Sequence, residues 1–135
     1  MLKPILFFFA VGFCILSCNS GNTKIPQTDT DVATAFIRNI LDNQLDAAEK
    51  FIFEDEANHQ YFEIIRQQYQ KKDKPELEKY KNADIIINEI SNVTDSISII
   101  NYSNSYDKIS KNKVKLVRIN GKWLIDLKYT FSGNL

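Results

Sequence analysis

The pair Asn120-Gly121 constrains the fold of this chain most, because it joins two runs of mainly apolar residues at 113–119 and 122–129. Asn-Gly between such runs is the strongest short-range signal for a β-hairpin with a type I′ turn. A two-residue turn fixes the register of both strands. The predicted pairs are Ile119–Lys122, Arg118–Trp123, Val117–Leu124, Leu116–Ile125, Lys115–Asp126 and Val114–Leu127.

The two faces of this hairpin differ in character. The face expected to meet the core carries Val114, Leu116, Arg118, Trp123, Ile125 and Leu127. The opposite face carries a cross-strand ion pair between Lys115 and Asp126. Val117 and Leu124 also lie on that outer face. They form a partner or homodimer surface, or they are scattered apolar residues of an ordinary surface.

Helices precede the hairpin and two further strands. Apolar residues at three- and four-residue spacing predict helices over 31–42, 45–52 and 57–72, with Thr30 as the first N-cap, and a short turn over 75–80. Runs of β-branched residues after Asn82 predict strands over 85–90 and 97–102. Helices followed by antiparallel strands indicate the α+β class, with N-terminal helices packed on a four-stranded sheet.

The first residues do not belong to this pattern. Lys3 precedes an almost wholly apolar run, 5–16, that would rise about 18 Å as a helix. A membrane hydrocarbon core is about 30 Å thick, so the run is too short for a normal span. A positive start followed by a short apolar run is typical of a secretory signal.

The apolar run ends in Ile15-Leu16-Ser17-Cys18, which resembles the bacterial lipobox. A small residue is needed before the cleavage site, and the thiol of the cysteine takes a diacylglyceryl group. The resemblance implies a lipoprotein signal peptide over 1–17 and lipidation of Cys18. It implies a bacterial cell-envelope protein, periplasmic or surface-exposed, that is attached to the membrane through Cys18. The alternative is an ordinary signal peptide with two incidental cysteines.

The polar segment 18–30 contains glycine and proline and is predicted to be a flexible tether, which leaves 31–135 as the folded domain. Lys and Arg together number 17, as do Asp and Glu, so the formal net charge is zero. Nucleic-acid-binding domains normally carry a clear basic excess. The charge balance therefore argues against a nucleic-acid partner.

The order of elements carries a second resemblance. A first helix, then Asn43-Gln44-Leu45-Asp46-Ala47-Ala48 opening a second, then strands ending in the Asn-Gly-Lys-Trp hairpin, looks like the nuclear-transport-factor-2-like superfold. Over about 30–130 the chain resembles small bacterial lipoproteins of the domain-of-unknown-function 4878 family, also called lumazine-binding-like. The resemblance implies a cystatin-like cone, in which a curved four-stranded sheet wraps over helices, often around a cavity. It implies no established activity.

A cavity of this kind would be lined by one aromatic-rich inward face. Its candidate residues are Phe36, Tyr61, Ile65, Trp123 and Ile125. The same five side chains are equally well explained as ordinary core. The expected ligand is a small apolar molecule, and the other expected partner is an envelope protein.

His59 is the one histidine of the chain and follows the acidic segment Glu54-Asp55-Glu56. It is either a general base oriented by Asp55 or Glu56, or an exposed residue at a helix start. The acidic group, which Glu63 extends, lacks the spacing of a calcium-binding loop. No phosphate-binding loop, nucleophile elbow or zinc motif is present. The sequence therefore predicts no catalytic residue, no metal and no cofactor.

Two further surface features have competing explanations. The basic stretch Lys108, Lys111, Lys113 and Lys115 either contacts anionic lipid headgroups or guards a strand edge. Asp95-Ser96-Ile97 resembles a bacterial O-glycosylation site at Ser96.

These observations predict a non-enzymatic, membrane-anchored envelope lipoprotein that binds a small apolar ligand or a protein partner. The first alternative is a protein-interaction module, such as an immunity or accessory protein, that uses the Val117/Leu124 face. The second is an isomerase- or hydrolase-type enzyme of the same superfold.

Overall fold

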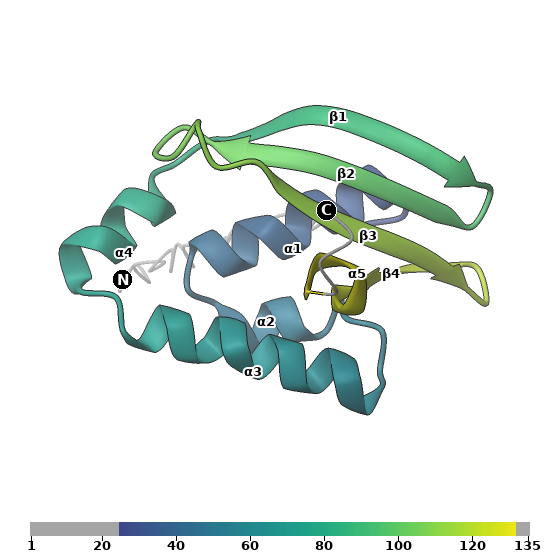
Figure 1. Cartoon of the computed structure of the whole chain (residues 1–135), viewed down its shortest axis with the longest axis horizontal. Coiled ribbons are helices and arrows are strands. Elements are labelled where there is room, and N and C mark those ends of the chain that lie inside the picture. The colour runs from purple at the N-terminus through teal and green to yellow at the C-terminus, as the bar shows by residue number, and fades with distance from the viewer. Residues whose placement is uncertain (1–24, 132–135) are drawn as a thin grey trace, which may run out of the picture.

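The computed structural model describes residues 25–131, which form an α+β fold with the predicted four-stranded antiparallel sheet. The elements are α1 (Asp29–Leu41), α2 (Leu45–Glu49), α3 (Glu56–Gln70), α4 (Lys74–Lys81), β1 (Ile85–Thr94), β2 (Ile97–Asn104), β3 (Asn112–Ile119), β4 (Lys122–Asp126) and α5 (Leu127–Phe131). The strands follow one another in the order β1-β2-β3-β4. Figure 1 shows α1 beneath the sheet, α2 and α3 below α1, and α4 at one end.

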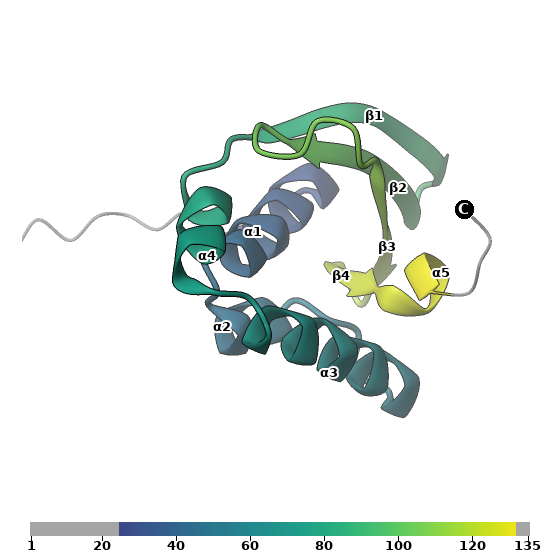
Figure 2. The same ribbon diagram turned by 60° about the vertical axis from the view of Figure 1, so that its left-hand side comes forward.

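The sheet curves around α1, as the turned view in Figure 2 shows. Buried side chains of α1, among them Phe36 and Ile37, pack with Phe62 of α3 and with the inner face of the sheet. On the sheet side, Ile100 and Leu116 are wholly buried in this cluster. The core therefore lies on the concave side of the sheet.

The hairpin between β3 and β4 has the predicted turn. Asn120 and Gly121 have φ angles of 50° and 80°, the positive values that a type I′ turn requires. The five pairs from Ile119–Lys122 to Lys115–Asp126 are all present. Lys115 Nζ lies 3.4 Å from Asp126 Oδ2, which confirms the cross-strand ion pair.

The second strand of the hairpin ends earlier than predicted. β4 stops at Asp126 and α5 begins at Leu127, so the predicted Val114–Leu127 pair is not formed. The cause is the wholly buried Asn58 of α3, whose Oδ1 accepts a hydrogen bond of 2.8 Å from the N–H of Leu127. The Thr130 hydroxyl of α5 then donates to the carbonyl of Lys113 over 3.0 Å.

Four of the six residues predicted on the core face of the hairpin are buried, namely Val114, Leu116, Ile125 and Leu127. Arg118 is exposed and Trp123 is half-buried, because both lie next to the turn and beyond the helices.

The helix bounds differ from the prediction by up to three residues, α3 for example ending at Gln70 and not at residue 72. α1 begins at Asp29 because Thr28, not Thr30, is its N-cap, so 29–30 belong to the helix and not to the tether. Thr28 Oγ1 accepts from the N–H of Asp31, and the Asp31 carboxylate accepts from the N–H of Thr28, which makes a capping box. The predicted second helix ends at Glu49. The predicted turn over 75–80 is the complete helix α4, capped by Asp73.

Segments between the helices and the sheet complete the architecture. After α2 the chain pairs with the edge of β4 through a parallel bridge between Ile52 and Ile125. β1 runs on to Thr94 with two irregularities in its register, so it is longer than the predicted strand 85–90. Arg38 of α1 holds the C-terminal end of α4. Its guanidinium donates hydrogen bonds to the carbonyls of Tyr80 and Lys81 in α4 and of Ala83 just beyond it.

Gly121→Ala is expected to lower the free energy of unfolding by about 1–2 kcal/mol, because Gly121 has a φ of 80° that an L side chain rarely adopts. No atom lies within 4 Å of an added Cβ, so the loss would come from backbone strain and not from a clash. Urea denaturation measures the effect. The exposed neighbour Lys122→Ala serves as the control, and equal stability of both variants would contradict the turn assignment.

Candidate functional site

A partly enclosed cavity of about 380 Å³ lies between α1, α3, α5 and the concave side of the sheet. Its apolar floor comes from α1, which supplies Phe36, Ile37, Ile40 and Leu41. This volume falls within the range of about 300–1,000 Å³ that is usual for small-molecule pockets. A second, more open hollow of about 640 Å³ lies beside His59 and Glu49, but the more enclosed, apolar-floored cavity is the better candidate for a small apolar ligand.

The predicted cavity residues divide into three groups. Phe36 and Ile65 line the cavity. Tyr61 does not, but its ring stacks on Phe131 of the cavity wall, with ring centroids 4.9 Å apart. Ile125 is wholly buried in the core, and the half-buried Trp123 packs against that core near the hairpin turn, so neither lines the cavity.

Three tyrosines line the cavity, Tyr69, Tyr80 and Tyr102, and none of them was among the predicted cavity residues; Tyr69 and Tyr102 come from the α3 and sheet sides. Tyr69 follows Ile65 by one helical turn on α3, and Tyr102 follows Ile100 by two positions on β2, so both continue inward-facing patterns. This spacing in the sequence indicates that both side chains face inward. Sequence alone does not show that their side chains border a space instead of filling it.

Tyr69 and Tyr102 keep their protons at neutral pH. Desolvation by burial raises the pKa of the Tyr102 hydroxyl to about 12. Burial, and then the proximity of Tyr102, raises the pKa of Tyr69 well above its usual value. Within residues 25–131, neither hydroxyl has a hydrogen-bond partner from the protein. Tyr69 and Tyr102 thus place neutral hydroxyl groups at the cavity that can donate hydrogen bonds.

Lys72 places a positive charge at the cavity. Its Nζ lies 4.6 Å from the ring centroid of Tyr80 and 5.7 Å from that of Tyr69, and it pairs with Glu76. Desolvation by burial lowers the pKa of Lys72, but the hydrogen bond with Glu76 and nearby negative charge outweigh this and raise it above its usual value. Lys72 is therefore charged beside the two aromatic rings.

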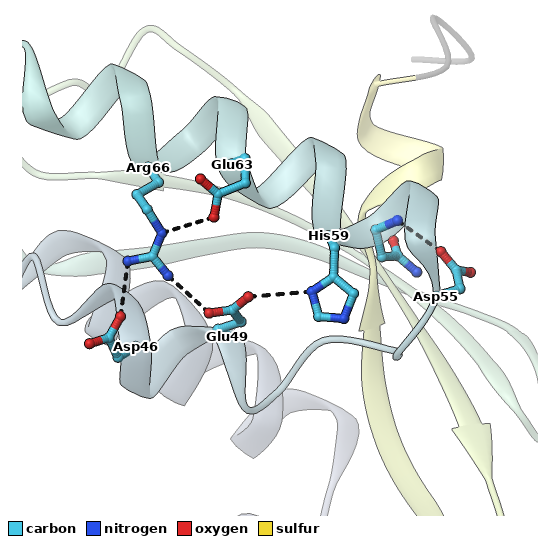
Figure 3. Close-up of polar contacts among 7 residues, drawn as sticks. Asp46, Glu49, Asp55, His59, Glu63 and Arg66 are labelled. Atoms are coloured by element: carbon cyan, nitrogen blue, oxygen red, sulfur yellow. Dashed lines mark hydrogen bonds and ion pairs between the residues drawn. The ribbon is translucent and has the colours of Figure 1, made fainter.

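His59 lies outside the cavity, in an ion-pair network between α2 and α3 (Figure 3). The guanidinium of Arg66 pairs with three carboxylates: Nη1 lies 2.9 Å from Asp46 Oδ1, Nη2 lies 2.9 Å from Glu49 Oε2, and Nε lies 3.1 Å from Glu63 Oε1. The other oxygen of Glu49 is 3.3 Å from Nδ1 of His59, whose side chain is 50% exposed. The partner of His59 is therefore Glu49 and not Asp55 or Glu56. The network joins two helices at the surface.

Asp55 connects α3 with α5 instead. Its side chain accepts a 2.8 Å hydrogen bond from the N–H of Asn58 as the N-cap of α3, and it forms an ion pair with Lys128. Together with the buried Asn58–Leu127 hydrogen bond, this contact holds α5 against the start of α3.

The remaining candidates lie on the surface or outside the described residues. Val117 and Leu124 are half-buried on the outer sheet face, and Ser96 is exposed in the β1–β2 turn. Lys108 and Lys111 are exposed. The predicted signal peptide 1–17, the predicted lipidation site Cys18 and the first part of the predicted tether lie outside the described residues, which begin at residue 25.

Comparison with family models, with curated proteins and with solved structures found no match to this chain. Between residues 25 and 131, no helix is long and apolar enough to cross a membrane. The same part of the chain contains no group of three or more His, Cys, Asp or Glu side chains placed to hold a metal ion.

Asp55→Asn is expected to destabilise the protein near pH 7 but not near pH 2. The hydrogen bond from Lys128, and then that from Asn58, holds the pKa of Asp55 below its usual value of 3.8. A lowered folded-state pKa gives stability that is present above the unfolded-state pKa and is lost as the pH falls through the folded-state value. Asparagine is also a good N-cap, so the substitution removes mainly the charge.

Urea midpoints of the wild type and Asp55→Asn at both pH values test this expectation. An equal difference between the two proteins at both pH values would contradict the role of the Asp55 charge.

Proposed function

We propose that this protein is a non-enzymatic lipoprotein of the bacterial envelope whose domain binds a small, mainly apolar molecule. The observation that carries the proposal is the cavity of about 380 Å³ with its apolar floor on α1. Protein interiors are close-packed and leave few voids larger than a water molecule. A space of this size, partly open and lined by apolar side chains, is therefore suited to a ligand.

The proposal includes a nuclear-transport-factor-2-like fold and membership of the lumazine-binding-like family. Its support is the curved antiparallel sheet that wraps over α1, together with the Asn-Gly-Lys-Trp hairpin in its expected register. In this arrangement the cavity lies between the concave sheet face and the helices, which is where the resemblance implies one.

A non-enzymatic role is supported by the groups that line the cavity. No histidine of the described chain lines it. Asp107 is the one carboxylate there among residues 25–131, and it accepts hydrogen bonds from the N–H groups of Ile109 and Ser110 of its own loop. The side-chain and backbone hydrogen bonds from Ser110 hold the pKa of Asp107 below its usual value. These groups suit binding better than proton transfer near pH 7.

A protein-interaction module remains the second candidate function. The register aligns Ile97, Val117 and Leu124 across three strands on the outer sheet face, where Ile99 lies close by. All four side chains are already half-buried. The apolar area left for a partner or a second copy is therefore small, which favours the cavity over this face.

A cavity-filling substitution tests the ligand-binding proposal. Ile65→Trp should abolish binding of phenylnaphthylamine, a neutral apolar fluorescent dye, because Ile65 lines the cavity. Ile64→Trp is the matched control, since Ile64 is the adjacent residue and is 41% exposed. Fluorescence titration of the full chain measures both affinities. The proposal fails if the wild type does not bind the dye, or if both variants bind it equally well.

The membrane anchor is tested separately by Cys18→Ala. The change removes the thiol that would carry the lipid, so the protein should keep its signal peptide and lose lipid labelling. A single acyl chain anchors only marginally, whereas a lipoprotein carries two or three. Fractionation of bacterial cells, with mass spectrometry of the intact protein, gives the result. Unchanged mass and lipid labelling in the variant would refute lipidation at Cys18.

A further inference from the structure

The wall of the cavity is divided by polarity. The α1 side is apolar, with Phe36, Ile37 and Ile40. Polar groups come from the other elements, with Tyr69 on α3, Lys72 just after that helix, and others on α4 and β2. A ligand that matched both parts would need an apolar body and a polar head.

Two other polar side chains of the cavity wall, Asn104 and Thr130, have partners within the protein. Asn104 Oδ1 accepts from the N–H groups of Tyr106 and Asp107, at 3.0 and 2.8 Å. The Thr130 hydroxyl donates to the Lys113 carbonyl. These groups are already occupied and leave little for a ligand to satisfy.

The hydroxyls of Tyr69 and Tyr102 are different. Both residues line the cavity, and within the described chain neither hydroxyl has a hydrogen-bond partner. Tyr69 is buried and Tyr102 is half-buried, so both hydroxyl groups are largely shielded from bulk solvent but remain free to bond with a ligand. Both are protonated at neutral pH, so both can donate to an oxygen that enters the cavity.

Charge at the cavity points to the sign of the head group. The Lys72 ammonium lies beside the rings of Tyr69 and Tyr80 and is only 20% exposed. The Asp107 carboxylate is already engaged by its own loop. The two tyrosine hydroxyls and the Lys72 ammonium would therefore stabilise a carboxylate head group through charge-assisted hydrogen bonds. A cationic head group would instead meet two hydrogen-bond donors and be repelled by the Lys72 ammonium.

We infer that the ligand is an amphiphile with an apolar body on the α1 floor and a carboxylate or carbonyl head that accepts hydrogen bonds from Tyr69 and Tyr102 beside Lys72. The inference rests on the proposed ligand-binding function and adds the chemical class of the ligand. It also assigns the two tyrosines as the residues that select the head group.

Two amphiphiles of equal chain length test the head-group preference in the unmodified full chain. Decanoate should displace phenylnaphthylamine about tenfold more strongly than decylamine, because only decanoate can accept hydrogen bonds from both hydroxyls. Equal displacement, or stronger displacement by decylamine, would overturn the inference while leaving the ligand-binding proposal intact. Failure of the dye itself to bind would overturn both.

Single substitutions then test the two tyrosines. Tyr69→Phe and Tyr102→Phe should each weaken decanoate binding about tenfold, because each removes one hydroxyl and keeps the ring. Tyr106→Phe is the matched control, since Tyr106 packs edge-on against Tyr80 and does not line the cavity. Decanoate affinity that is unchanged in both cavity variants would overturn the assignment. If either variant fails to fold, the comparison of decanoate with decylamine in the wild-type protein still tests the inference.

Discussion

The hydrogen bond between the buried amide of Asn58 and the backbone of Leu127 determines where the sheet ends and where the cavity closes. The bond is 2.8 Å long and wholly buried. It turns the chain out of β4 and into α5, which places Leu127 and Phe131 on the cavity wall. Phe131 in turn stacks on Tyr61 of α3. Continuation of the strand would have replaced this end wall with a longer hairpin.

Polar contacts at the periphery hold the helices in place around the core and its cavity. Arg66 joins α3 to two carboxylates of α2, and Arg38 joins α1 to the end of α4. Asp55 pairs with Lys128 and so joins α3 to α5. These contacts fix the positions of the helices from outside the cavity. The apolar floor and the two tyrosine hydroxyls consequently remain available to a ligand.

Local chemistry predicted those parts of the fold that depend on neighbouring residues. The register of the hairpin follows from Asn120-Gly121 alone, which is why its pairs are found as expected up to Asp126. The end of β4 was not predictable, because it depends on Asn58, 69 positions away from Leu127. Periodicity placed Phe36 and Ile65 on the inward face but could not separate a cavity wall from a solid core. The roles of Tyr69 and Tyr102 depend on that distinction, so they emerged only from the arrangement of the elements.

Methyl NMR of the isoleucines in the full chain, titrated with decanoate, tests most directly the claim that the concave side of the sheet binds an amphiphile. The account predicts chemical-shift changes at Ile37, Ile40 and Ile65, which line the cavity. It predicts no change at Ile97 and Ile99, which lie on the outer sheet face with Val117. Shifts confined to the outer face, or no shifts at any of these methyl groups, would contradict it.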